Sequence, residues 1–164
     1  GEIDFAGRTI SDDLKWSEDD LDAITYSGAM NWSRSDTKES YESLMGDSSN
    51  AAIKWFYAED DELAMGILEA LNGGGIRSTA IYETRPVLTG CGGLDEYYEV
   101  LRGNSYADIV DNFDGVMSVT YSPAMIQSAI QDMVDYLNGE TVEQDHVIEC
   151  ENVVPENVAD YPSF

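Results

Sequence analysis

The feature that most constrains the fold of this chain is residues 51–71, AAIKWFYAEDDELAMGILEAL, where one sequence period gives way to another. The first part is a short apolar run rich in aromatic side chains, which is typical of a strand. The second part places apolar residues at positions 63, 64, 67, 68 and 71, which predicts an amphipathic helix. A strand that runs directly into a helix is half of a βαβ unit, so we expect parallel strands.

Four carboxylates, residues 59–62, stand between this strand and this helix. The helix macrodipole favours negative charge at a helix N-terminus, so helix capping is one explanation of the cluster. Ligand binding is the other, because ligands of open α/β sheets bind outside the carboxyl ends of the strands, where we expect Asp60. The sequence leaves both explanations open.

Acidic residues dominate the composition, with 33 Asp and Glu against 8 Lys and Arg and a formal net charge of −25. Phosphates would be repelled and no basic stripe exists, which argues against binding to nucleic acid or to an anionic membrane surface. The excess of acid fits an adaptation to solubility or high salt better than a store of cations. No run approaches the roughly 20 apolar residues of a transmembrane helix, and no signal peptide is evident.

The rest of the chain continues the alternation of strands and helices, and 164 residues predict a single domain, 1–164. Ser17 and Asp20 have the spacing of a capping box, with Leu21 and Ile24 as buried positions of the helix that follows. Further helices are predicted at 35–45, 94–101 and 123–138, and further strands at 2–5, 24–26, 78–82, 86–89, 116–121 and 146–150. We therefore expect a three-layer αβα lobe with a mainly parallel, flavodoxin/Rossmann-like sheet.

Few residues of the chain could carry catalysis. The only histidine, His146, has no glycine-flanked serine elbow to accompany it, and no phosphate-binding loop is present. Cys91 and Cys150 do not form a metal motif, and both a disulfide and two separate thiols remain open. Asp60 and Asp61 offer oxygen ligands for Mg²⁺, so a magnesium-dependent enzyme that uses this pair is an alternative.

Aromatic and hydrogen-bonding groups follow several of the predicted strands. They are Asn31, Trp32, Arg34, Asp60, Cys91, Gly92 and Tyr121. A ring face can stack on the C–H face of a sugar, and carboxylates accept hydrogen bonds from hydroxyl groups. This set suits a neutral polyol and needs no catalytic base, although ordinary packing at the rim would explain the two aromatic residues equally well.

Five segments resemble, in order, those of type I periplasmic sugar-binding proteins, the solute receptors of ABC importers for ribose, galactose and similar sugars. Residues 58–66 (AEDDELAMG) resemble the family's A-x-N-D-x-M-A-x-G-A segment, and residues 29–34 (AMNWSR) resemble the loop that supplies a stacking aromatic. Residues 88–93 resemble the family's V-x-G-x-D-G strand end. Residues 118–123, with the helix that follows as far as residue 139, resemble the segment around the family's last hinge, and residues 152–161 resemble its closing segment. The resemblance spans roughly residues 24–161.

This resemblance implies a periplasmic binding protein-like fold and a binding protein, without catalysis and without a cofactor. Trp32 would stack on the sugar and Tyr121 would occupy a polar hinge contact. Asp60 stands where the family has a sugar-binding Asn, and Gly92 stands where many relatives have a ligand-binding Asp. The implied partners are a sugar or polyol and an ABC permease, outside the cytoplasm in the periplasm or at the cell surface. The sensing core of a sugar-responsive regulator or sensory receptor is the alternative.

Members of this family have two lobes, and the resemblance covers only about the second. We therefore expect the chain to correspond to a C-terminal lobe plus the helix at 123–138, which in relatives packs on the N-terminal lobe. The apolar stripe of that helix would be exposed unless another surface covers it. A homodimer formed through this helix is the expected consequence.

Overall fold

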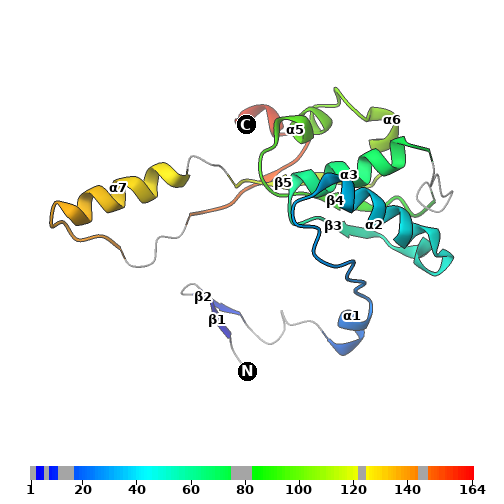
Figure 1. Cartoon of the computed structure of the whole chain (residues 1–164), viewed down its shortest axis with the longest axis horizontal. Helices are drawn as coiled ribbons and strands as arrows, with labels where there is room; N and C mark the ends of the chain where they lie inside the picture. Colours follow the sequence, from blue (N-terminus) through cyan, green and yellow to red (C-terminus); the bar gives the residue numbers. More distant parts are fainter. Residues whose placement is uncertain (1–2, 6–7, 11–16, 75–82, 122–124, 144–147) are drawn as a thin grey trace. The chain divides into compact units, whose positions relative to one another are not determined.

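The computed structural model describes residues 3–5, 8–10, 17–74, 83–121, 125–143 and 148–164 (Figure 1). The chain divides into two compact units. One consists of Ala29–Pro123 and Cys150–Phe164, and we call it the sheet unit because it contains the main sheet. The other consists of Gly1–Gly28 and Ala124–Glu149.

The main sheet has four strands in the order β3-β4-β5-β6. The first three, β3 (Trp55–Tyr57), β4 (Val87–Thr89) and β5 (Gly115–Val119), are parallel to one another. The short strand β6 (Asn152–Val153) pairs with β5 in the antiparallel direction. The prediction of an α/β fold with a mainly parallel sheet is confirmed.

One face of this sheet carries the hydrophobic core. Phe56, Leu88 and Val116 lie side by side in register, and all three are buried. The helices of the core are α2 (Arg34–Gly46), α3 (Asp61–Asn72) and α5 (Asp95–Leu101), and α3 contacts the other two (Figure 1). Because burying one large apolar side chain contributes about 1.5–3 kcal/mol, this layer supplies much of the stability of the sheet unit.

The helices of the core begin and end close to the predicted positions. Asp60 caps α3 by accepting a hydrogen bond from the backbone N–H of Glu62 at 2.8 Å. Gly74, just beyond the helix, has a left-handed backbone with φ of 72°, which glycine adopts without strain. Helix α5 packs on the core through three buried residues, Tyr97, Tyr98 and Leu101.

Strand β3, which the sequence predicts, is buried on one side only. Phe56 faces the core, but Trp55 and Tyr57 are 71% and 78% exposed. Successive side chains of a strand point to opposite faces, so these two aromatic residues lie on the face away from the core.

The beginning of the chain departs from the predicted parallel pattern. Strand β1 (Ile3–Phe5) pairs antiparallel with β2 (Arg8–Ile10) in a separate two-stranded sheet. The capping box of Ser17 is confirmed, and it begins helix α1 (Glu18–Asp22). However, residues 24–26 form no strand, and the predicted core positions Leu21 and Ile24 are exposed. A strand needs a neighbouring strand to satisfy its backbone, and within the described residues none lies beside 24–26.

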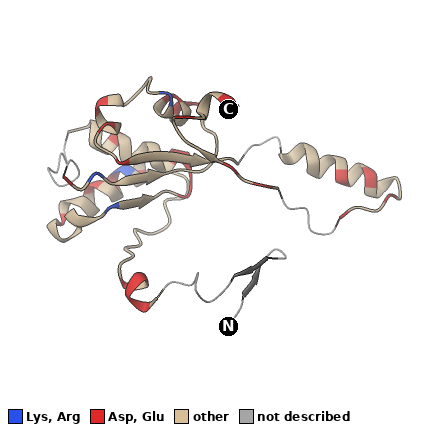
Figure 2. Cartoon of the chain, turned by 180° about the vertical axis from the view of Figure 1, so that it is seen from behind, with Lys and Arg blue, Asp and Glu red and all other residues tan. Residues whose placement is uncertain are grey.

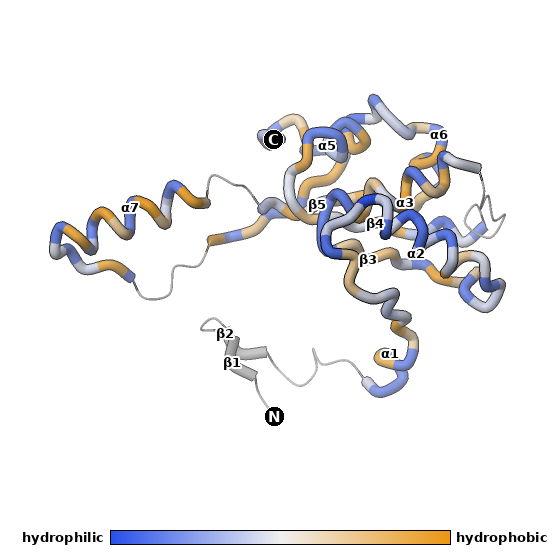
Figure 3. The backbone as a smooth tube through the Cα atoms, in the orientation of Figure 1, coloured by the Kyte–Doolittle hydropathy of each residue, from blue (hydrophilic) through white to orange (hydrophobic). Residues whose placement is uncertain are grey.

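Helix α7 (Met125–Leu137) agrees with the predicted helix, although Ser122 and Pro123 lie outside the described residues. Its apolar residues recur at helical spacing (Figure 3). Those exposed are Ile126, Ile130, Met133, Val134 and Leu137. No helix in the described ranges has the length and apolar character needed to cross a membrane.

Other predicted elements fall partly or wholly outside the described residues. The strand at 78–82 and His146 lie there, and residues 148–150 form no strand. The last strand is β6, slightly later in the chain than predicted. The described part of the sheet unit also contains the short helices η2 (Ser48–Ala52), α6 (Ala107–Val110) and η3 (Val158–Asp160).

Candidate ligand-binding site

The segments that follow β3, β4 and β5 meet at the carboxyl edge of the sheet. The N–H of Asp61 donates to the carbonyl oxygen of Cys91 at 2.8 Å. The N–H of Gly92 donates to the carbonyl oxygen of Val119 at 2.9 Å, and the N–H of Tyr121 donates to the carbonyl oxygen of Gly92 at 3.0 Å. The predicted site residues that these bonds gather at one edge are Asp60, Cys91, Gly92 and Tyr121.

Asp61 is the anchor of this edge. Its side chain is buried, and the residue is only 1% exposed. Oδ2 accepts hydrogen bonds from the N–H groups of Gly93 at 2.7 Å and Leu94 at 3.0 Å, while Oδ1 accepts one from Oγ of Ser118 at 2.7 Å. Burial raises the pKa of Asp61, and these hydrogen bonds act in the opposite direction. One carboxylate therefore links the start of α3 to the loop after β4 and to β5.

Two glycines make room for this carboxylate. A Cβ on Gly90 would lie 2.3 Å from Oδ1 of Asp61, and a Cβ on Gly92 would lie 3.2 Å from Oδ2. Gly92 also has φ of 147°, which a side chain would strain. The sequence predicts Asp61 as a helix-capping carboxylate or a metal ligand, and it does not predict the hydrogen bond from Ser118. The glycines on either side of Cys91 were the signal that a bulky group from elsewhere fills this space.

The same geometry bears on the magnesium alternative. Both oxygens of Asp61 already accept hydrogen bonds, and one oxygen of Asp60 caps α3. Within the described part of the chain, no group of three or more His, Cys, Asp or Glu side chains could hold a metal ion. A cation bound by this pair would have to displace buried donors, so the geometry does not favour that function.

Cys91 is partly buried next to Asp61. Burial, together with the charge of Asp61, raises the pKa of the Cys91 thiol, so the thiol is held in its neutral form. No disulfide joins Cys91 to Cys150. The neutral thiol and the adjacent Gly92 present a small, uncharged surface at the edge of the sheet.

Trp32 lies in a left-handed turn before α2. Asn31 and Trp32 have φ of 48° and 57°, and the N–H of Ser33 donates to the carbonyl oxygen of Met30 at 2.8 Å. Ser33 then caps α2 by accepting a hydrogen bond from the N–H of Asp36 at 3.2 Å. The Trp32 side chain is 75% exposed, so its indole face is accessible to a ligand.

Arg34, in the first turn of α2, forms ion pairs with three glutamates. Its Nε lies 2.6 Å from Glu62, its Nη1 3.4 Å from Glu69 and its Nη2 2.5 Å from Glu96. Burial lowers the pKa of Arg34, but the hydrogen bonds and charges of Glu62 and Glu96 outweigh it, so the pKa is raised. Because Glu62 and Glu96 lie in the first turns of α3 and α5, the N-terminus of α2 and the turn with Trp32 lie at the same edge of the sheet.

The charges around the site disfavour an anionic ligand. Acidic residues are spread over the sheet unit, and basic ones are few (Figure 2). Arg34 is paired as described, Arg85 pairs with Asp114 and Arg102 pairs with Glu99. The formal net charge of the whole chain, with these basic residues already counted, is −25, and its potential disfavours anions at the rim.

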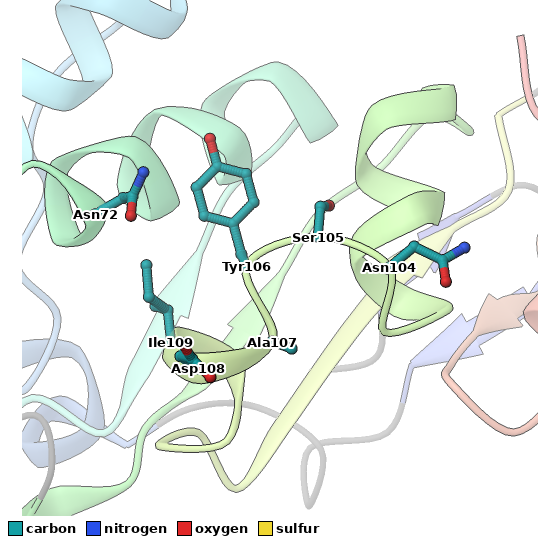
Figure 4. A pocket seen from close by; sticks show the side chains of 7 residues that line it. All are labelled: Asn72, Asn104, Ser105, Tyr106, Ala107, Asp108 and Ile109. Atoms are coloured by element: carbon teal, nitrogen blue, oxygen red, sulfur yellow. The ribbon is translucent and has the colours of Figure 1, made fainter.

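A surface cavity of about 410 Å³ lies elsewhere, near the C-terminal end of α3 and around α6 (Figure 4). Its lining residues are Asn72, Asn104, Ser105, Tyr106, Ala107, Asp108 and Ile109. None of them belongs to the predicted site, and Asn72 lies at the opposite end of α3 from Asp60. The cavity is therefore separate from the carboxyl edge of the sheet.

Comparison with known proteins gives structural matches only. No family model matches the sequence, and no curated protein matches it. A galactofuranose binding protein superposes with a TM-score of 0.58 at 18% identity, over 77% of this chain and 39% of that one. The periplasmic binding protein component of the arabinose ABC transporter from Shewanella sp. ANA-3, bound to α- and β-L-arabinofuranose, gives 0.58 at 17% identity, over 78% and 38%. A structure from Mycobacterium smegmatis gives 0.55 at 17% identity, over 78% and 38%.

These matches establish the fold and the extent of the likeness. At such low identity the shared property is the arrangement of helices and strands, in agreement with the fold expected from the sequence. The chain spans about 39% of the length of the galactofuranose binding protein, so each of these structures contains a further part with no counterpart here.

Proposed function

Because the chain has the fold of type I periplasmic sugar-binding proteins, we propose that it binds a monosaccharide-like carbohydrate as part of the solute-binding component of an ABC transporter. It would bind without chemical transformation, outside the cytoplasm, and deliver its ligand to a permease. The two named structural neighbours are binding proteins for furanose sugars, which supports this class of ligand.

One observation carries the proposal. The loops after three parallel strands, together with the turn before α2, bring the predicted site residues to the carboxyl edge of the sheet. Trp32 and Tyr121 offer exposed rings, and Asp60 has a carboxylate oxygen that does not cap α3. Stacking of a ring on a sugar and hydrogen bonding of hydroxyl groups to a carboxylate need these groups and no catalytic base.

We further propose that the chain corresponds to a C-terminal lobe plus the helix at 123–138, which would pack on a second lobe. The division into two units supports this, because α7 lies outside the sheet unit. Its exposed apolar stripe is a surface that a second lobe or a second copy of the chain would cover. A second copy would make the chain a dimer, and gel filtration that shows only a monomer would contradict dimerisation through α7.

The test of sugar binding uses L-arabinose and D-galactose as probes in calorimetric titrations. Trp32→Ala should weaken binding by about 1–3 kcal/mol, which is the effect of losing one aromatic contact. Trp55→Ala is the matched control, because Trp55 is equally exposed but lies at the start of β3, away from the carboxyl edge. An equal effect of both substitutions would remove Trp32 from the site, and no binding of either sugar would contradict the proposed ligand.

A further inference from the structure

We infer that Arg34 is a positioning residue for Trp32. It fixes the first turn of α2, and with it the left-handed turn that presents the indole ring, and it does not contact the ligand. This role differs from the ligand contact expected from the sequence. The inference rests on the proposed function for its ligand, but its structural part can be tested without one.

The guanidinium group is already engaged by carboxylates. Each of its three nitrogens lies within 3.4 Å of a glutamate oxygen, and these glutamates come from α3 and α5. The Arg34 side chain is only 24% exposed. A sugar hydroxyl is a weaker acceptor for a guanidinium than a carboxylate is, so a neutral ligand would not displace these partners.

The backbone of α2 is held at the same place by a second contact. A Cβ on Gly66 of α3 would lie 2.6 Å from the carbonyl oxygen of Arg34 and 2.9 Å from Cβ of Thr37. The first turn of α2 therefore rests directly on α3, where no side chain fits between them. The ion pairs and this contact together prevent α2 from sliding or rotating on α3.

The Trp32 side chain is largely exposed, so packing around the indole does not fix its direction. Its direction is set by the left-handed backbone of Asn31 and Trp32. Such a conformation is strained for a residue with a side chain, and it persists only where the surroundings hold it. After Trp32 the surroundings are the first turn of α2, which Arg34 ties to α3 and α5.

The first experiment needs no ligand. Trp16→Phe and Trp55→Phe together leave Trp32 as the only tryptophan, so its fluorescence anisotropy reports the motion of this side chain. Arg34→Gln in that background should lower the anisotropy, and Arg34→Lys should restore part of it. Arg85→Gln, which removes the ion pair between Arg85 and Asp114 in two loops of the sheet unit, is the matched control and should leave the anisotropy unchanged. Equal anisotropy in Arg34→Gln and its parent would overturn the inference.

The second experiment is a double-mutant cycle with L-arabinose as the probe. Arg34→Gln should weaken binding about tenfold, and it should weaken binding no further once Trp32→Ala is present, because its effect acts through Trp32. Losses that simply add would mean that Arg34 contacts the sugar directly, which would overturn the inference. If the unmutated chain does not bind L-arabinose, the proposed ligand fails, and the anisotropy of Trp32 alone decides the role of Arg34.

Discussion

Replacing Asp61 with alanine should destabilise the sheet unit strongly, because the substitution leaves three buried donors without an acceptor. These donors are the N–H groups of Gly93 and Leu94 and the hydroxyl of Ser118. A buried donor that loses its acceptor costs about 1–3 kcal/mol. Since the hydroxyl can rotate toward another acceptor, we expect Asp61→Ala to lower the free energy of unfolding by about 3–5 kcal/mol.

Asp61→Asn provides the internal comparison. An asparagine of the same shape can accept from Gly93 and Leu94 with its amide oxygen and donate to Ser118 with its amide nitrogen. It therefore keeps all three partners and loses only the charge. Because no partner is lost, we expect Asp61→Asn to lower the free energy of unfolding by no more than about 1 kcal/mol, which is the usual net contribution of one hydrogen bond.

Urea unfolding followed by circular dichroism, at one fixed salt concentration, measures these differences. Asp60→Ala is the matched control, because it removes a neighbouring carboxylate that caps α3, and losing such a cap typically costs about 1 kcal/mol. The reasoning is refuted if Asp61→Ala is no more destabilising than Asp60→Ala, or if Asp61→Asn is as destabilising as Asp61→Ala.

Three further predictions follow from the structure. Gly66→Ala should lower the free energy of unfolding by about 1–3 kcal/mol through overpacking against Arg34, whereas Gly46→Ala, where a Cβ would meet nothing within 4 Å, should not be destabilising; equal urea midpoints would contradict this. Burial raises the pKa of Asp61 in the folded state above its ordinary value of 3.8, so protonation of Asp61 favours folding. The free energy of unfolding should therefore gain a contribution from Asp61 as the pH falls through the raised pKa toward 3.8, and the Asp61→Asn variant should lack this gain. A difference in stability between the unmutated protein and Asp61→Asn that does not change with pH would argue against this. Since the net charge is −25, raising NaCl from about 0.1 M to 1 M should raise the melting temperature by screening repulsion, and an unchanged or lower melting temperature would exclude this effect.

Features that depend on a few consecutive residues could be predicted from the sequence. The capping box of Ser17 is such a feature, because donor and acceptor lie three residues apart. The start of α3 after Asp60 follows equally from local chemistry, and the parallel sheet follows from the order of strands and helices. Their physical causes act within one turn of helix or one strand–helix unit.

Features that depend on distant partners could not be predicted in the same way. The glutamates paired with Arg34 lie 28, 35 and 62 positions further along the chain, and no local pattern links them to it. The strand-like composition of residues 24–26 does not produce a strand, because pairing needs a neighbour that the sequence does not specify. Asp60 and Asp61 look alike in the sequence, and only the packing around Gly90 shows that one of them is buried.

The bonds of Asp61 have a mechanical consequence. They tie together three stretches of backbone that are far apart along the chain, at the point where those stretches come closest. Moving any one stretch alone would break a hydrogen bond shielded from water, so the three can shift only together. Such a rigid sheet edge cannot change its shape to suit different ligands, so selectivity between ligands would depend on how well each one fits a fixed shape.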